Sequence, residues 1–264
     1  MPTLPTLADT VLYDTLVNYL IGMARTVEAA MNRALEAIVS RDAARAALLP
    51  GEVFLLEPRI NEMEGVIDEY AIRLLRRGNF TDDEMRLIVA ALKITNDLER
   101  IGDLAVNLAQ CVTSLKEMPN AQAPDELEPM TGAVRSMVGN SLGALIFRNA
   151  RMASRVLESD DIVDQYRDRI FETLLEQMTQ KTEYVSPGMQ YILATRHLER
   201  IADHATNIAE DIIYWVHGLD VRHGRGLTMH LDESTGSGDE ETTVIENSHG
   251  LHSDVKATCE PSGA

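Results

Sequence analysis

Two segments of the chain, one hundred residues apart, repeat the same acidic and amide side chains. The first reads ITNDLERIGDLAVNLAQ over residues 94–110, and the second reads ATRHLERIADHATNIAE over residues 194–210. From Glu99 and from Glu199 onward, seven of eleven positions are identical, and these include a Glu, an Asp and an Asn. A shared apolar core would preserve hydrophobic character rather than carboxylates at fixed offsets. The repeat therefore indicates an internal duplication that has kept its polar atoms.

On a helix, these repeated polar residues fall within one narrow stripe, because successive residues are about 100° apart. Glu and Asp four residues apart repel each other on a helix, and oxygen donors stacked one turn apart suit a metal ion. We therefore interpret each stripe as a candidate metal-binding face, with a merely solvated face as the alternative. The predicted ligands on the two stripes are Glu99, Asp103 and Asn107, and Glu199, Asp203 and Asn207.

Each half also carries a polar pair upstream of its stripe. These pairs are Glu57 with Asn61 in the first half and Asp160 with Asp164 in the second. Asn61 stands where the second half has an acid, and Pro58 lies inside the first pair, where it is expected to kink or restart the helix. The second half is therefore expected to bind metal more strongly than the first.

The elements that must position these residues are helices. We predict six, over residues 9–41, 52–77, 81–116, two within 129–182, and 186–217, from apolar residues spaced three and four apart. Thr81 and Glu84 form a predicted capping box, and Ser186 before Pro187 is a predicted N-cap. The prediction is an all-α fold of two tandem, sequence-related three-helix bundles, residues 1–116 and 129–226, joined by a linker over 117–128.

Composition excludes several classes of protein. The formal net charge of −18 argues against nucleic-acid binding. No apolar run is long enough to span a bilayer, no signal-like segment is seen at the start, and two cysteines fit a reducing, cytoplasmic setting. Residues 227–264 are acidic and rich in Ser, Thr and Gly, which predicts a disordered acidic C-terminal tail.

The paired E-R-I-[GA]-D-x-A-x-N-[LI]-A segments, the upstream pairs and the tandem three-helix organisation resemble the PhoU family of phosphate-transport accessory and regulatory proteins. The resemblance covers about residues 9–218. It implies metal clusters, commonly of iron, zinc or manganese, bound on the bundle surface by the repeated motifs. It also implies a cytoplasmic negative regulator of phosphate uptake and of the phosphate-starvation response. Its implied partners are the ATPase subunit of the phosphate importer and a phosphate-sensing histidine kinase, so membrane association would be peripheral and through these partners; a homodimer is also implied.

Two other interpretations remain open. A carboxylate-bridged di-metal enzyme would use Glu-x-x-His on two helices of a bundle. Here Gly102 and Ala202 stand three residues after the stripe glutamates, and His197 and His204 lack the required spacing. These departures favour a protein that is not an enzyme. A metal-free helical adaptor, whose polar stripes bind basic partners directly, is the other alternative.

Overall fold

The computed structural model describes residues 7–118 and 120–222, with side chains described from residue 12 onward. This part of the chain contains seven α-helices, one 3₁₀ turn and no strand, so the all-α prediction is confirmed for it. The predicted tail, residues 227–264, lies outside the described residues. The helices up to Asp220 belong to one compact unit. Within the described ranges, no helix has both the length and the hydropathy needed to cross a bilayer.

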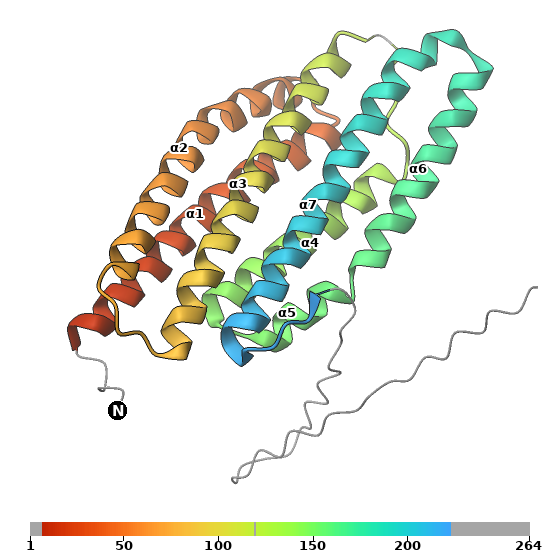
Figure 1. Cartoon of the computed structure of the whole chain (residues 1–264). Helices are drawn as coiled ribbons and strands as arrows, with labels where there is room; N and C mark the ends of the chain where they lie inside the picture. The colour runs from red at the N-terminus through yellow and green to blue at the C-terminus, as the bar shows by residue number, and fades with distance from the viewer. Residues whose placement is uncertain (1–6, 119, 223–264) are drawn as a thin grey trace, which may run out of the picture. The chain divides into compact units, whose positions relative to one another are not determined.

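Three long helices form the first half of the molecule: α1 (Leu7–Val39), α2 (Ala43–Leu75) and α3 (Asp82–Lys116) (Figure 1). Each of them packs against the other two. An apolar stripe on α1 faces inward, because hydrophobic residues recur there at three- and four-residue steps. Its fully buried members include Leu16, Leu20, Met23 and Val27.

Local polar signals fix where these helices begin. The Asp42 carboxylate accepts hydrogen bonds from the backbone amides two and three residues further on, which caps α2. Thr81 and Glu84 exchange hydrogen bonds with each other's backbone amides, so the predicted capping box of α3 is confirmed. Between the two helices, Gly78 and Asn79 adopt left-handed backbone angles, with φ of 69° and 60°. These conformations cannot continue a helix, and they reverse the chain.

The predicted limits of the second helix, residues 52–77, are wrong. The helix starts earlier, at Ala43, and ends at Leu75. A restart of the helix at Pro58 is not found, because α2 is continuous through this residue. Val53 and Ile60, on either side of the proline, are both buried. Their packing against the bundle holds the segment in helical register despite the missing backbone donor.

The second half contains more helices than predicted. They are α4 (Leu127–Phe147), α5 (Ala150–Leu157), α6 (Asp160–Gln180) and α7 (Val185–His217), with a 3₁₀ turn, Thr182–Tyr184, before α7. Residues 129–182 therefore form parts of three helices rather than two. The extra break lies at Arg148, whose φ of 49° is left-handed, and Asn149 then caps α5 by accepting from the Met152 amide.

The predicted N-cap at Ser186 is wrong. The 3₁₀ turn leads directly into α7, which begins at Val185, so Ser186 already lies inside the helix. Tyr184 occupies the capping position and makes no side-chain capping hydrogen bond. Pro187 remains within the first turn of the helix, where a missing backbone donor has little cost.

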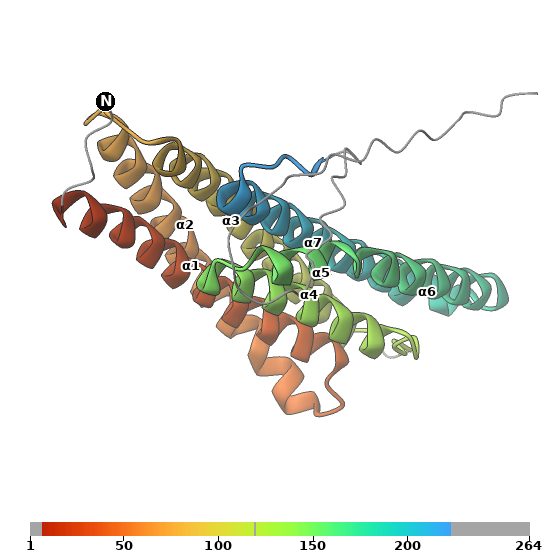
Figure 2. The ribbon, with the colours of Figure 1, turned by 90° about the horizontal axis from the view of Figure 1, so that it is seen from below.

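The two halves meet along α3 and α7, which share the most extensive contact between any two helices of the described chain. Both helices lie between α1 and α2 on one side and α6 on the other (Figures 1 and 2). Lys93 of α3 forms an ion pair with Asp211 of α7, and Asp97 contacts His204 one turn further along. The pairing runs in opposite directions along the two helices, so α3 and α7 are antiparallel. The duplicated segments therefore lie side by side at the centre of the molecule.

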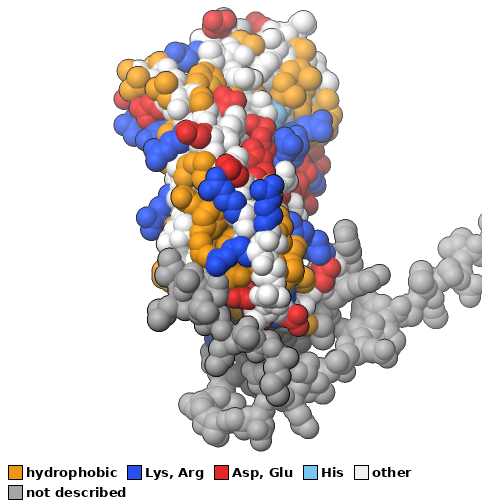
Figure 3. Space-filling view, turned by 60° about the vertical axis from the view of Figure 1, so that its left-hand side comes forward, with side chains coloured by type: hydrophobic (Ala, Val, Ile, Leu, Met, Phe, Trp, Pro, Cys, Tyr) orange, Lys and Arg blue, Asp and Glu red, His pale blue; other side chains and the backbone are white. Residues whose placement is uncertain are grey.

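The surface mixes hydrophobic side chains with acidic and basic ones, as Figure 3 shows for one face. On α2, the large exposed hydrophobic residues are Leu48, Phe54, Leu55, Val66, Ile72 and Leu75. Single exposed apolar side chains are common on folded proteins and do not by themselves mark an interface.

Candidate metal centre

The second half brings four predicted ligands into one acidic cluster, formed by Asp160 and Asp164 of α6 with Glu199 and Asp203 of α7. Burial raises the pKa of the Asp160 carboxyl, and the charges of Asp164, Asp161 and Glu199 raise it further. Burial also raises the pKa of Asp203, with Asp160 and Glu199 adding to the effect. The charges of Asp164 and Glu199 thus act on the carboxyls of both helices, and Arg167 contacts Asp164 and Glu199 together. We call this group the second cluster.

Sequence reasoning missed Arg167, which lies within the second cluster. Its Nη1 is 2.8 Å from Asp164 Oδ1 and 2.5 Å from Glu199 Oε1, and its Nη2 is 2.9 Å from Asp168 Oδ1. Hydrogen bonds to Glu199 and Asp168 raise the pKa of the guanidinium above its ordinary value. Arg167 follows Asp164 by three residues, a spacing that places both side chains on one face of a helix. This spacing could have identified Arg167 from the sequence. The carboxylates of this cluster are therefore already partly neutralised by the protein itself.

The first half places Glu99 and Asp103 together on α3. The Glu99 side chain is only 16% exposed, and its Oε2 atom is buried without a hydrogen bond in the described part of the chain. Burial raises the pKa of Glu99, and the charges of Asp103 and Glu64 raise it further, whereas Arg100 lowers it. Arg100 also contacts Asp103, with 3.4 Å between Nη1 and Oδ2. We call Glu64, Glu99 and Asp103 the first cluster.

The first cluster includes Glu64 of α2, which sequence reasoning also missed. Glu57, Asn61 and Glu64 are spaced four and three residues apart, so they share one face of the helix. Glu64 is the α2 carboxylate whose charge acts on Glu99, and the predicted pair lies further along the same face. Glu57 is half-buried and Asn61 is exposed. The spacing could have identified Glu64, because it extends the predicted stripe by one turn.

The two stripe asparagines have different surroundings. Asn207 donates from Nδ2 to Asp97 Oδ1 over 3.3 Å, and His204 Nδ1 lies 2.8 Å from the same oxygen. Asp97 is buried, at 7% exposure, so it gains both partners from α7. Asn107 is half-buried on α3. The amide of Asn207 thus contributes to the joint between α3 and α7 in this structure.

Both clusters have the chemistry of a cation site. Their donors are carboxylate oxygens, which hard divalent cations and iron accept. Burial and, to a smaller extent, neighbouring carboxylates raise the pKa values of Glu99, Asp160 and Asp203, and a bound cation would offset both effects. Among the described residues, however, no three His, Cys, Asp or Glu side chains are arranged closely enough to hold a metal ion as they stand. The residues therefore fit a metal in type and charge, and their side chains must move to bind one.

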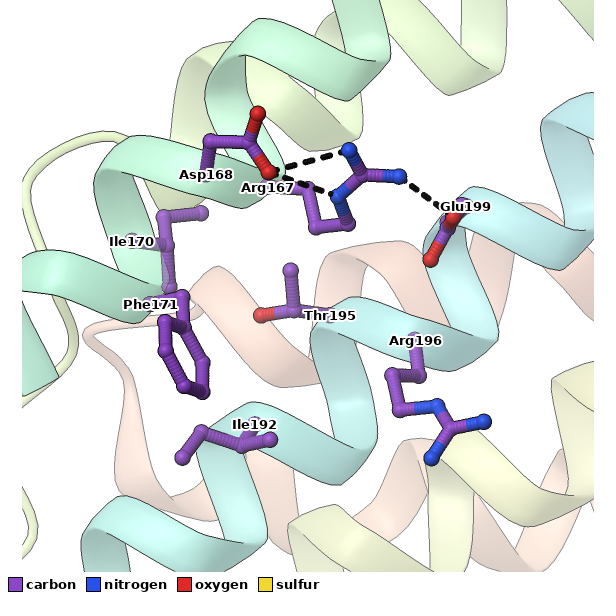
Figure 4. A pocket seen from close by; sticks show the side chains of 8 residues that line it. All are labelled: Arg167, Asp168, Ile170, Phe171, Ile192, Thr195, Arg196 and Glu199. Atoms are coloured by element: carbon purple, nitrogen blue, oxygen red, sulfur yellow. Dashed lines mark hydrogen bonds and ion pairs between the residues drawn. The ribbon is translucent and has the colours of Figure 1, made fainter. Parts of the chain in front are cut away.

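A pocket of about 400 Å³ adjoins the second cluster between α6 and α7. Figure 4 shows Arg167 between Asp168 and Glu199 at its edge, with Phe171 and Ile192 along the apolar wall. The charged and apolar parts of this groove are thus continuous.

The described chain is thus an all-helical tandem repeat, with an acidic cluster on the α2–α3 pair and another on the α6–α7 pair. A family model described as the PhoU domain matches the chain twice, over residues 20–112 and 127–212. The chain therefore belongs to the PhoU family, as the sequence resemblance predicts.

Relatives extend over both halves. The chain is 35% identical over 217 residues to a phosphate-specific transport system accessory protein PhoU homolog from Pseudomonas aeruginosa, covering 82% of this chain and 88% of that protein. It is 29% identical to PhoU homolog 1 of Thermotoga maritima, covering 74% and 83% of the two chains. The crystal structure of PhoU from Pseudomonas aeruginosa matches with a TM-score of 0.75 and 32% identity, over 80% of this chain and 99% of that one. A phosphate transport regulatory protein PhoU from Streptococcus pneumoniae matches with a TM-score of 0.71 and 27% identity, over 80% and 98%.

Proposed function

We propose that this protein is an accessory regulator of phosphate transport that acts by binding other proteins rather than by catalysis. The observation that carries the proposal is the match of both halves to the PhoU domain, in relatives named as accessory proteins of the phosphate-specific transport system. The proposed partners are the ATPase subunit of a phosphate importer and a phosphate-sensing histidine kinase, in the cytoplasm. When phosphate is plentiful, the protein restrains uptake and keeps the starvation response off.

The physical basis of such regulation is a difference in affinity. A helical protein shifts a transporter or kinase toward its inactive state only by the amount that it binds this state more tightly. The extended seam between α3 and α7 supports this role, because it joins the two halves into one compact unit that can present a fixed surface. A homodimer, which would repeat that surface, belongs to the same proposal.

Recovery of the tagged protein from phosphate-replete and phosphate-starved cells tests the partners. Proteins that copurify after crosslinking are quantified by mass spectrometry. Enrichment of an importer ATPase or a sensor kinase that changes with phosphate supports the proposal. Absence of both partners under both conditions would count decisively against it.

The proposal includes metal ions, of iron, zinc or manganese, bound by the two acidic clusters. Asp160, Asp164, Glu199 and Asp203 would hold the ion in the second half, with Glu99, Asp103 and Glu64 doing so in the first. A bound ion would supply positive charge that draws each helix pair together. The double substitution Glu199→Gln with Asp203→Asn should lower the metal content measured by mass spectrometry while helicity is retained. Unchanged metal content in that variant would remove the second cluster from the proposal.

A further inference from the structure

The two halves differ in the residue that faces the stripe glutamate from the neighbouring helix. In the first half, Glu64 of α2 acts on Glu99 as a second negative charge. In the second half, Arg167 of α6 donates to Glu199 instead. Glu64 follows Glu57 by seven residues, as Arg167 follows Asp160, so the two occupy equivalent positions. The duplication thus has a carboxylate in one half and a guanidinium in the other.

Arg167 is held by carboxylates on both helices of its pair. One nitrogen, Nη1, serves both Asp164 of α6 and Glu199 of α7, at 2.8 and 2.5 Å. Nε and Nη2 bind Asp168 at 3.0 and 2.9 Å. The side chain is 30% exposed, and that of Glu199 is 26% exposed, so the contacts are partly shielded from water. A guanidinium held by three carboxylates in this way is bound more strongly than one in a single surface ion pair.

Two carboxylates that would bind a metal ion are therefore occupied by a cation of the protein. While the guanidinium holds Asp164 Oδ1 and Glu199 Oε1, its positive charge opposes the approach of a divalent cation to these oxygen atoms. Figure 4 shows that Asp168 lies on the other side of the Arg167 guanidinium from Glu199, at the edge of the adjoining pocket. The guanidinium can thus leave Glu199 and keep a carboxylate partner.

We propose that Arg167 is a tethered counter-ion that competes with a divalent cation for the second cluster, so that metal binds there only when the guanidinium leaves Asp164 and Glu199. The inference rests on the metal binding proposed above. Binding and ion pairing are then linked: the ion pair weakens metal binding, and metal weakens the contact between Arg167 and α7 by the same factor. The first cluster has Glu64 at the equivalent position, and its arginine, Arg100, lies further from the carboxylates, at 3.4 Å from both Glu99 Oε2 and Asp103 Oδ2. The two halves of the duplication therefore differ in their response to the same ion.

Titration of the full chain with Mn²⁺, followed by calorimetry, tests this competition. A background of Glu99→Gln and Asp103→Asn removes the first cluster, so that only the second one binds. In this background Arg167→Gln should raise the Mn²⁺ affinity about tenfold, within the usual range of coupling between linked sites. Arg169→Gln is the matched control, because Arg169 is exposed on the same helix and has no ion pair within the described residues. It should leave the affinity unchanged.

Thermal unfolding without metal provides a second measurement. Arg167→Gln should lower the melting temperature in a chelator, because three carboxylates lose their counter-ion, and Mn²⁺ should then raise it by more than in the parent. Arg167→Lys, which keeps the charge but not the forked geometry, should give an intermediate affinity. An Arg167→Gln protein that is folded but binds Mn²⁺ no more tightly would overturn the proposal. So would the absence of Mn²⁺ binding with and without Arg167. A failed partner experiment would leave this titration unaffected, since it is made on the purified protein.

Discussion

The carboxylates of the two clusters lower the stability of the metal-free protein at neutral pH. Glu99, Asp160 and Asp203 all have pKa values above their ordinary ones. The folded state therefore binds protons more readily than the unfolded state, so stability rises as pH falls through the raised pKa. The loss of stability is complete at a pH above the raised pKa, and it vanishes at a pH below the ordinary pKa of the carboxyl. A bound cation removes the same penalty at neutral pH by a different route.

Asp203 allows a direct test of whether a carboxylate of the second cluster lowers stability and also strengthens metal binding. Asp203→Asn should raise the melting temperature of the metal-free protein at pH 7 by about 1–2 °C, a small effect because part of the side chain is open to water, which screens its charge. The difference should disappear as pH falls toward 3.8, the ordinary pKa of an aspartate. The same variant should bind Mn²⁺ more weakly. Glu172→Gln, an exposed change elsewhere on α6, should alter neither property. A destabilised Asp203→Asn protein at pH 7 would contradict a net cost of burial and repulsion at this carboxylate.

At the scale of elements, the α2–α3 and α6–α7 pairs fill the equivalent contact between their helices with side chains of different size. Gly102 of α3 faces Ile60 of α2, and a Cβ added to the glycine would lie 3.0 Å from Ile60 Cδ1. The equivalent positions in the second half hold Ala202 and Val163, both buried. The first half combines a glycine, which has no side chain, with the large isoleucine. The second half combines the small alanine with the smaller valine. The sizes compensate, as tight packing requires.

This compensation predicts a non-additive pair of substitutions. Gly102→Ala should cost about 1 kcal/mol, because the clash with buried Ile60 exceeds the gain in helix propensity. Ile60→Val alone should also cost about 1 kcal/mol. Combined, the two should cost clearly less than their sum, since the valine lacks the Cδ1 atom that the new methyl group meets. Urea unfolding measures the free energy of unfolding of the two single variants and of the double variant. Gly65→Ala, with open space around the new Cβ, is the control and should stabilise α2. Additive costs would mean that α2 and α3 move apart freely.

The cap of α3 gives another prediction for a single element. Thr81→Ala should cost about 1 kcal/mol, because it removes the hydroxyl that accepts from the Glu84 amide. Ser186→Ala is a matched control: the sequence predicts a cap there, but the structure places the residue inside α7. It should change the free energy of unfolding by less than about 0.5 kcal/mol. Equal losses in the two variants would contradict the helix start found at Val185.

Signals within one helix were predictable, and signals that depend on a neighbouring helix were not. The duplicated stripe, the apolar spacing of α1 and the Thr81 box are local, and each is found in the structure. The break at Arg148 has a local signal in the Asn149 cap, and the Arg148 guanidinium also lies 5.0 Å from the ring of Trp215 on α7, a contact that the sequence does not indicate. Pro58 misled the prediction for the opposite reason, since packing outweighs the local rule. Arg167 and Glu64 were missed because their importance depends on Glu199 and Glu99 across the helix pair.

At the scale of the molecule, the antiparallel seam of α3 and α7 makes the two halves depend on each other. It buries Asp97, which has its hydrogen-bond partners His204 and Asn207 on the opposite half. It also includes the ion pair of Lys93 with Asp211, whose side chain is 6% exposed. A buried carboxylate that loses such partners is left with its full desolvation cost. Neither half therefore satisfies its own buried polar groups alone.

The whole unit is accordingly predicted to unfold in one step. Trp215 is the single tryptophan of the chain and lies buried in α7, so its fluorescence reports on the second half. Far-ultraviolet circular dichroism reports on all helices, and the urea midpoints of the two signals should coincide. Asp97→Ala, made in the first half, leaves His204 and Asn207 of the second half without their hydrogen-bond partner. It should lower both midpoints together and reduce the free energy of unfolding by about 2–3 kcal/mol. Asp161→Ala, an exposed change, is the control. If Asp97→Ala shifts the dichroism but leaves the tryptophan transition in place, the halves unfold independently, and the seam is only a contact between two separately stable bundles.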